Sequence, residues 1–218
     1  MSITADSLVE YERGINLFDA PDMADELFIG RDAEIQRMEK ILLPGSDSGH
    51  RKILVLGGMG GIGKTQLSIA YAKRHGSTYS SVFWLNSTSE LALKGSFRKL
   101  AHRILAPETA DQPDDNRLWI EISNWLCEPD NSHWLLIFDN YDNLDEYNIT
   151  QYYPAVAHGS IIVTTRVPSR ITGSKVHVRS LSKEEDSLRI LSTRSGREGI
   201  DLGMSSLFSC KRCGTSIS

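Results

Sequence analysis

Short runs of apolar residues alternate along the chain with longer stretches in which apolar residues recur every three or four positions. The runs at 52–56, 81–85, 134–138 and 160–164 are nearly continuous, which is typical of strands buried on both faces of a parallel sheet. A shorter run at 176–178 is a fifth candidate strand. Helical spacing is found at about 35–42, 64–74, 90–105, 118–126 and 181–194. This alternation predicts an α/β fold, with a mainly parallel five-stranded sheet between two layers of helices.

The two ends of the chain lack such a pattern. Residues 1–25 show no sustained period and are predicted to be an N-terminal arm or linker. Residues 26–198 hold every predicted strand and helix, so we expect them to form one domain. Residues 199–218 contain mainly Gly, Ser and scattered Cys, and we expect a disordered or aberrant C-terminal tail there.

Charge and cysteine content narrow the class of protein. The 218 residues carry 24 basic and 28 acidic side chains, which argues against a strongly basic nucleic-acid or membrane-surface binder. Every apolar run is far shorter than the roughly 18 residues that cross a bilayer, and the N-terminus does not resemble a secretory signal. Three cysteines are too few for a disulfide scaffold. We therefore expect a cytoplasmic protein with neither nucleic acid nor membrane as partner.

Residues 58–65 carry the strongest chemical signal. They fit the pattern of a glycine, four variable residues, a second glycine, lysine and threonine, and they lie between a predicted strand and a predicted helix. Glycines let successive N–H groups surround an anion, and the helix adds its positive end. Lys64 would reach the β- and γ-phosphates, and Thr65 would hold Mg²⁺. The expected nucleotide-binding residues are Gly58, Gly60, Gly61, Ile62, Gly63, Lys64, Thr65 and Gln66.

An acid at the end of a later strand completes the expected metal site. Asp139 follows the apolar run 134–138, and the carboxyl ends of parallel strands face the ligand crevice of an open α/β sheet. Asp139 is therefore expected to hold Mg²⁺ with Thr65, either directly or through water.

The strand at 160–164 ends in two hydroxyls and a guanidinium. If this strand lies in the same sheet, Arg166 could sense or stabilise a γ-phosphate. The residues alone leave an exposed loop arginine equally open, and Arg170 is a second candidate.

Taken in order, the segments 28–31, 58–65, 134–140 and 159–166 resemble the NB-ARC branch of the STAND P-loop NTPases. Segments 83–86 and 180–185 add to this resemblance, which covers about residues 26–198. It implies a strand order of 5-1-4-3-2, with the strand of Arg166 between those of the phosphate loop and Asp139. It also implies ADP or ATP as ligand, an adenine pocket lined by Phe28, Ile29 and Arg31, and Arg166 as phosphate sensor.

Two departures from the family pattern bear on activity. The family commonly carries a second acid where this chain has Asn140, and an amide can orient a water but cannot take its proton. Asp142 is a possible substitute whose reach the sequence does not define. The chain also ends before the helical and winged-helix lid of the family, so we expect protein partners or self-association to depend on domains found in longer relatives.

Three functions remain open at this point. The first is an adenine-nucleotide switch module with weak or no hydrolysis. The second is an active P-loop ATPase or small-molecule kinase. The third is an interaction fragment that holds no nucleotide, because its lid is missing. No guanine-reading Asn-Lys-x-Asp motif and no ABC-type signature is present in the sequence.

Overall fold

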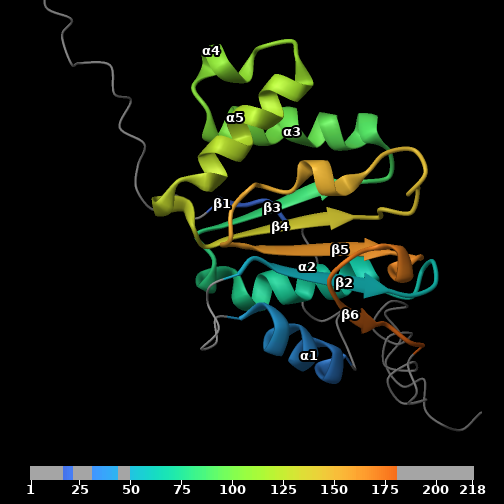
Figure 1. The fold of residues 1–218 in the computed structure, drawn as a ribbon. Coiled ribbons are helices and arrows are strands. Elements are labelled where there is room, and N and C mark those ends of the chain that lie inside the picture. Colours follow the sequence, from blue (N-terminus) through green and yellow to red (C-terminus); the bar gives the residue numbers. More distant parts are fainter. Residues whose placement is uncertain (1–16, 22–30, 44–49, 181–218) are drawn as a thin grey trace, which may run out of the picture. The chain divides into compact units, whose positions relative to one another are not determined.

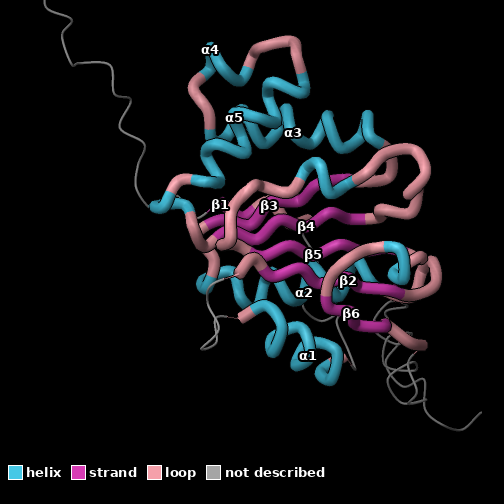
Figure 2. The backbone as a smooth tube through the Cα atoms, viewed as in Figure 1, coloured by secondary structure: helices cyan, strands magenta, loops and turns pink. Residues whose placement is uncertain are grey.

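The computed structural model describes residues 17–21, 31–43 and 50–180. These ranges belong to one compact unit, whose fold is shown in Figures 1 and 2. Phe28 and Ile29, the predicted helix at 181–194 and the predicted tail at 199–218 lie outside the described residues.

Six parallel strands form a single sheet, in the order β1-β3-β4-β5-β2-β6. Their bounds are β1 Leu17–Phe18, β2 Lys52–Gly57, β3 Ser81–Asn86, β4 Trp134–Asp139, β5 Ser160–Thr165 and β6 Ser174–His177. The five strands predicted from the apolar runs thus lie in the order β6-β2-β5-β4-β3, which confirms the predicted 5-1-4-3-2. The sequence pattern did not indicate β1, which lies within the range expected to be an arm and pairs with β3.

Helices cover both faces of the sheet, as predicted for a three-layer α/β/α fold (Figure 1). One face carries α1 and α2, and the other carries α3, α4 and α5 (Figure 2). The helices are α1 Asp32–Leu42, α2 Lys64–His75, α3 Glu90–Ile104, α4 Pro107–Ala110 and α5 Asp115–Cys127. Short 3₁₀ turns lie at Gly76–Thr78, Pro129–Asn131, Ile149–Tyr152 and Pro168–Arg170. In the described part of the chain, no helix has the length and apolar character needed to cross a membrane.

Alternation along the central strands builds the core on both faces. Alternate residues of β2 to β5 pack against α3 and α5, where the ring of Phe97 stacks on Trp119 with centroids 4.5 Å apart. The residues between them are buried as well. β4 is apolar up to Asp139, and β5 is buried throughout but has polar residues at both ends. A sheet enclosed on both faces leaves its strand ends as the place for polar chemistry.

Strand register brings three of these ends to one edge of the sheet. Gly57 at the end of β2 lies opposite Thr165 at the end of β5. Phe138, one residue before the end of β4, lies opposite Val163. The segments that follow β2, β4 and β5 therefore start next to one another, and these segments contain the residues singled out from the sequence.

Candidate functional site

The phosphate loop links β2 to α2 through two glycines in left-handed conformations. Gly61 has φ 74° and Gly63 has φ 99°, values that residues with side chains rarely adopt. A Cβ built at Gly61 would meet no atom within 4 Å, so open space lies beside this turn. The loop thus has the backbone that the glycine pattern predicts, with room for a ligand.

The start of α2 is ready to accept an anion. Its N-cap is Gly63, which provides no side-chain cap, and its first turn contains no acidic residue. Elsewhere in the sheet's helical layers, Ser89 caps α3 and Asp114 caps α5 with their own side chains. Within the described ranges, the N–H groups of Gly61, Gly63 and Lys64 donate to no backbone carbonyl. Free N–H groups and the positive helix end together favour a phosphate.

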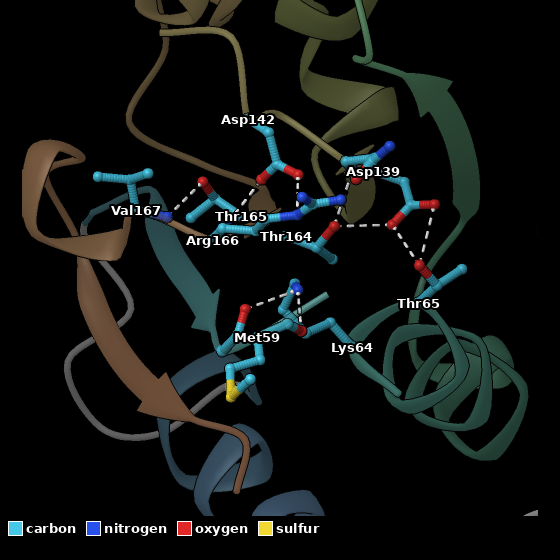
Figure 3. Close-up of polar contacts among 11 residues, drawn as sticks. Met59, Lys64, Thr65, Asp139, Asp142, Thr164, Thr165, Arg166 and Val167 are labelled. Atoms are coloured by element: carbon cyan, nitrogen blue, oxygen red, sulfur yellow. Dashed lines mark hydrogen bonds and ion pairs between the residues drawn. The ribbon is translucent and has the colours of Figure 1, made fainter. Parts of the chain in front are cut away.

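Lys64 is buried in the loop and bonded to it. Its Nζ donates to the carbonyls of Gly58 at 2.8 Å and Met59 at 2.9 Å, as Figure 3 shows for Met59. Burial is the main cause that lowers the pKa of Lys64, and the charge of Arg166 acts in the same direction against the carboxylates of Asp142 and Asp139. The Lys64 side chain thus folds back over the phosphate loop, where its ammonium can reach a bound phosphate.

Asp139 and Thr65 meet although 74 residues separate them. Thr65 Oγ1 donates to Asp139 Oδ1 at 2.9 Å, and Thr164 Oγ1 donates to the same oxygen at 2.7 Å (Figure 3). Burial raises the pKa of Asp139 above its ordinary value, while the hydrogen bonds from Thr164 and Thr65 and the charge of Lys64 oppose that rise. Three groups therefore stabilise the ionised form that a metal would need.

The Thr65–Asp139 pair suits Mg²⁺. Magnesium takes oxygen ligands at about 2.0–2.1 Å in octahedral geometry, which places neighbouring ligands about 2.9 Å apart. The two oxygens lie at that separation. Among the described residues, no group of three or more His, Cys, Asp or Glu side chains is placed to hold a metal ion, so Asp139 would be the single carboxylate ligand here. Phosphate oxygens and waters would have to supply the remaining ligands, as is usual for Mg²⁺ in nucleotide sites.

Asn140 bends the chain at the end of β4. Its φ is 65°, in the left-handed region where asparagine is one of the few acceptable residues other than glycine. Its backbone N donates to Thr164 Oγ1 at 2.8 Å, while its side chain is exposed. The residue thus has a conformational role that the sequence did not suggest, beside the role expected for its amide in orienting water.

Arg166 extends from the end of β5 over the phosphate loop. A Cβ built at Gly60 would lie 3.3 Å from its Cζ atom. Its Nε pairs with Asp142 Oδ2 at 2.9 Å (Figure 3). By contrast, Arg170 pairs with Asp145 at 2.6 Å, on exposed surface. Of the two arginines considered from the sequence, Arg166 is the one that the described contacts place at the loop.

Arg31 connects the loop to the end of the described chain. It is 9% exposed, and its guanidinium donates to the carbonyls of Ile62 at 3.0 Å and Arg179 at 2.5 Å. It also pairs with Glu34 at 3.1 Å. The resemblance assigned Arg31 to an adenine pocket, and the observed contacts add a structural role. Gln66, also expected at the nucleotide, lies half-buried in the first turn of α2.

Sequence reasoning missed Thr164 as a partner of Asp139 and left the position of Asp142 undefined. The hydroxyls at the end of β5 were a usable signal for Thr164, because a strand beside β4 presents them to its acid. Asp142 had no such signal, since its position depends on the left-handed turn at Asn140.

Comparisons with known proteins agree with this geometry. A nucleotide-binding leucine-rich repeat (NLR)-like protein of the fungus Hyaloscypha variabilis is 26% identical over 195 residues. The match covers 81% of this chain and 20% of the relative, so the chain spans about a fifth of the relative's length.

Solved structures share the fold at lower identity. The Aeropyrum pernix ORC1 protein in complex with DNA gives a TM-score of 0.58 at 17% identity, covering 90% of this chain and 57% of that one. The Drosophila ORC bound to DNA gives a TM-score of 0.56 at 16% identity, covering 85% and 50% of the two chains. At such identity these likenesses show the fold alone.

The NB-ARC domain profile matches residues 31–199, which include the phosphate loop, Asp139 and Arg166. With the sheet order, the glycine turn and the Thr65–Asp139 pair in place, the chain belongs to the NB-ARC domain family of nucleotide-binding P-loop proteins.

Proposed function

We propose that this NB-ARC domain binds ADP and ATP with Mg²⁺ and acts as a nucleotide-dependent switch whose own hydrolysis is slow or absent. The observation that carries the proposal is the meeting of three features at one edge of the sheet. These features are the uncapped start of α2, the buried ammonium of Lys64 and the Thr65–Asp139 pair. Adenine is the base that the family resemblance implies.

Each residue has a definite task in this proposal. The N–H groups at the start of α2 hold the phosphates, and Lys64 adds a charge-assisted hydrogen bond. Thr65 and Asp139 hold Mg²⁺, which neutralises charge on the phosphate oxygens when it is bound. Thr164 orients Asp139 through its 2.7 Å hydrogen bond. Arg166 lies above Gly60, where its charge can interact with a terminal phosphate.

Slow hydrolysis is supported by what surrounds the site. Asn140 replaces the acid that would accept a proton from an attacking water. Asp142 is the substitute considered from the sequence, yet its Oδ1 already accepts a hydrogen bond from the backbone N of Arg166 and its Oδ2 forms an ion pair with Arg166 Nε. A bound nucleotide would then act mainly through occupancy, because any ligand that prefers one conformation stabilises that conformation.

The contacts of Arg31 support a switch. Its guanidinium bridges the carbonyl of Ile62 in the phosphate loop and that of Arg179 at the end of the described chain. A change in the loop would alter this bridge. We further propose that the domain serves a cytoplasmic signalling protein, with protein partners or self-association supplied by additional domains, because the NLR-like relative is about five times as long as the match.

Nucleotide titration tests the binding site. Wild-type protein is titrated with ADP and with ATP in the presence of Mg²⁺, beside Lys64→Ala and a control, Lys99→Ala, which removes an exposed lysine from α3 on the other face of the sheet. Loss of a charge-assisted contact of roughly 1.5–3 kcal/mol should weaken binding by Lys64→Ala about 10–150-fold. Equal affinities for wild type and Lys64→Ala would contradict the assignment.

Mass spectrometry of the nucleotide retained on the purified chain separates the proposal from its two alternatives. Retained ADP or ATP without turnover supports the switch. Rapid turnover of ATP would indicate an active ATPase or kinase instead. A site that is empty after purification and binds no added nucleotide would indicate an interaction fragment.

A further inference from the structure

The turn at Asn140 brings a carboxylate to the end of the neighbouring strand. After the left-handed residue, Asp142 N donates to Asn140 O at 3.1 Å, and Tyr141 N donates to Thr164 O at 2.9 Å. Residues 140–142 therefore lie along the end of β5, bonded to its backbone. This is how Asp142 reaches a residue 24 positions later in the chain.

Asp142 holds Arg166 at two points. Its Oδ1 accepts from the backbone N of Arg166 at 2.7 Å, and its Oδ2 pairs with Arg166 Nε at 2.9 Å (Figure 3). The first contact fixes the main chain where β5 ends, and the second fixes the direction in which the side chain leaves it. The Arg166 side chain is nevertheless 61% exposed, so packing alone does not restrict it.

The restrained guanidinium lies over the phosphate loop. A Cβ at Gly60 would be 3.3 Å from Cζ and 3.4 Å from Nη2 of Arg166. Gly60 follows Gly58 and Met59, the two residues whose carbonyls accept from Lys64 Nζ. Within the described ranges, Asp142 engages Nε and the backbone N, and no acceptor engages the Nη groups. The outer donors of the guanidinium thus remain available beside the loop.

We propose that Asp142 is a positioning residue: by holding Nε of Arg166, it presents both Nη groups to the terminal phosphate of a bound nucleotide and so favours a triphosphate over a diphosphate. The inference rests on the proposed nucleotide-binding function. An arginine that is restrained before its ligand arrives loses less rotamer freedom on binding. A guanidinium that is paired at Nε still has both Nη groups as donors for phosphate oxygens. Pairing with Arg166 also offsets the repulsion that a lone carboxylate would exert on phosphate.

The test compares affinities for ADP and for the β,γ-imido analogue of ATP, both with Mg²⁺. The proteins are wild type, Asp142→Asn, Arg166→Ala and the double variant. Asparagine keeps an oxygen for the backbone N–H of Arg166 but loses the charge that pairs with Nε. The matched control is Asp145→Asn, which removes the carboxylate paired with Arg170 at 2.6 Å in the same two loops.

We expect Asp142→Asn to lower the ratio of triphosphate to diphosphate affinity about fivefold, the scale of an exposed ion pair. ADP affinity should stay unchanged, and Asp145→Asn should match wild type. Because Asp142 acts through Arg166, the double variant should have the same ratio as Arg166→Ala. Arg166→Lys keeps the positive charge but loses the two Nη donor groups of the guanidinium. Its ratio of triphosphate to diphosphate affinity should therefore fall toward that of Asp142→Asn.

Opposite results have distinct meanings. Tighter triphosphate binding by Asp142→Asn would show that the carboxylate holds Arg166 away from the terminal phosphate or repels that phosphate, and would overturn the inference. Additive losses in the double variant would overturn it as well, as would an unchanged ratio in Asp142→Asn with normal ADP binding. Absence of nucleotide binding by wild type would overturn the proposed function and, with it, this inference.

Discussion

Thr65 and Asp139 are in direct contact, with Thr65 Oγ1 donating to Asp139 Oδ1 at 2.9 Å. Thr65 lies in the first turn of α2 and Asp139 is the last residue of β4, so the contact joins the two halves of the candidate metal site. The same carboxylate oxygen also accepts from Thr164, a residue of the strand between them. The site is thus organised by hydrogen bonds among its own side chains.

Asp139→Asn should abolish the contribution of Mg²⁺ to nucleotide binding, because the amide lacks the charge that attracts the ion. Even partners of metal ligands change metal affinity about 10–100-fold when they are mutated, so loss of the ligand itself should cost at least that much. Titrations with and without Mg²⁺ measure the effect, with Asp130→Asn as a control at the opposite end of β4. A variant that keeps the full Mg²⁺ effect would argue against Asp139 as ligand.

Asn140→Asp should raise the rate of ATP hydrolysis. The variant supplies a proton acceptor at the end of β4, and general-base help typically contributes about 10²–10⁴-fold. Aspartate tolerates the left-handed backbone of this position almost as well as asparagine, so the fold should be retained. Steady-state phosphate release is measured beside wild type, Asn140→Glu and Asn140→Ala. A wild-type rate of about 1 s⁻¹ or more, typical of working enzymes, would contradict slow hydrolysis.

Gly159→Ala should destabilise the fold strongly. Gly159 has φ 83°, and a Cβ there would lie 2.3 Å from Trp134 Cε2. The indole is fully buried and its Nε1 donates to Leu126 O at 2.9 Å, so the ring cannot move aside easily. Backbone strain and overpacking each cost about 1–3 kcal/mol, and together we expect about 3 kcal/mol or more.

Urea unfolding measures this loss against Gly95→Ala. Gly95 lies in α3 with no atom within 4 Å of an added Cβ, and alanine in an exposed helix interior should stabilise by about 0.5–1 kcal/mol. Equal effects of the two substitutions would refute the steric account of Gly159.

Glu90 should make stability depend on acid pH. The hydrogen bond from Tyr152, followed by that from Lys94, lowers the pKa of Glu90 below 4.5 in the folded chain. The ionised group therefore stabilises the fold above pH 4.5, and this contribution is lost as the pH falls through the lowered pKa. Free energies of unfolding are compared for wild type and Glu90→Gln from neutral to acid pH. The advantage of wild type should shrink below pH 4.5, whereas a gap constant at all pH values would exclude the effect.

Much of the fold followed from apolar runs, because strands enclosed on both faces need continuous apolar sequence. The strand β1 was missed because its two residues are too few to form an apolar run or show a period. The glycine pattern located the phosphate loop, whose conformation depends mainly on local residues such as Gly61 and Gly63.

Contacts between distant residues were harder to anticipate. Pairing of Thr65 with Asp139 was expected, because strand ends converge at one edge of a parallel sheet. The contact of Asp142 with Arg166 was not expected, because it depends on the left-handed conformation of Asn140. Asparagine also occurs in ordinary backbone conformations, so the sequence did not define this turn. The bridge from Arg31 to the carbonyls of Ile62 and Arg179 had no sequence signal, because its acceptors are main-chain atoms.

Close main-chain contacts at Gly57 and Gly58, where β2 leads into the phosphate loop, restrict which residues these positions can accept. Gly58 N donates to Thr165 O at 3.3 Å, and Val178 N donates to Gly57 O at 2.8 Å, so β5 and the end of β6 are both bound to the loop without any side chain. Almost any residue can preserve such bonds. The close approach nevertheless leaves no space at two positions, where a Cβ would lie 2.4 Å from Pro168 Cγ at Gly57 and 2.7 Å from Val178 O at Gly58. Substitution is therefore blocked at these two glycines, because even a methyl group would collide with Pro168 or with the backbone of Val178.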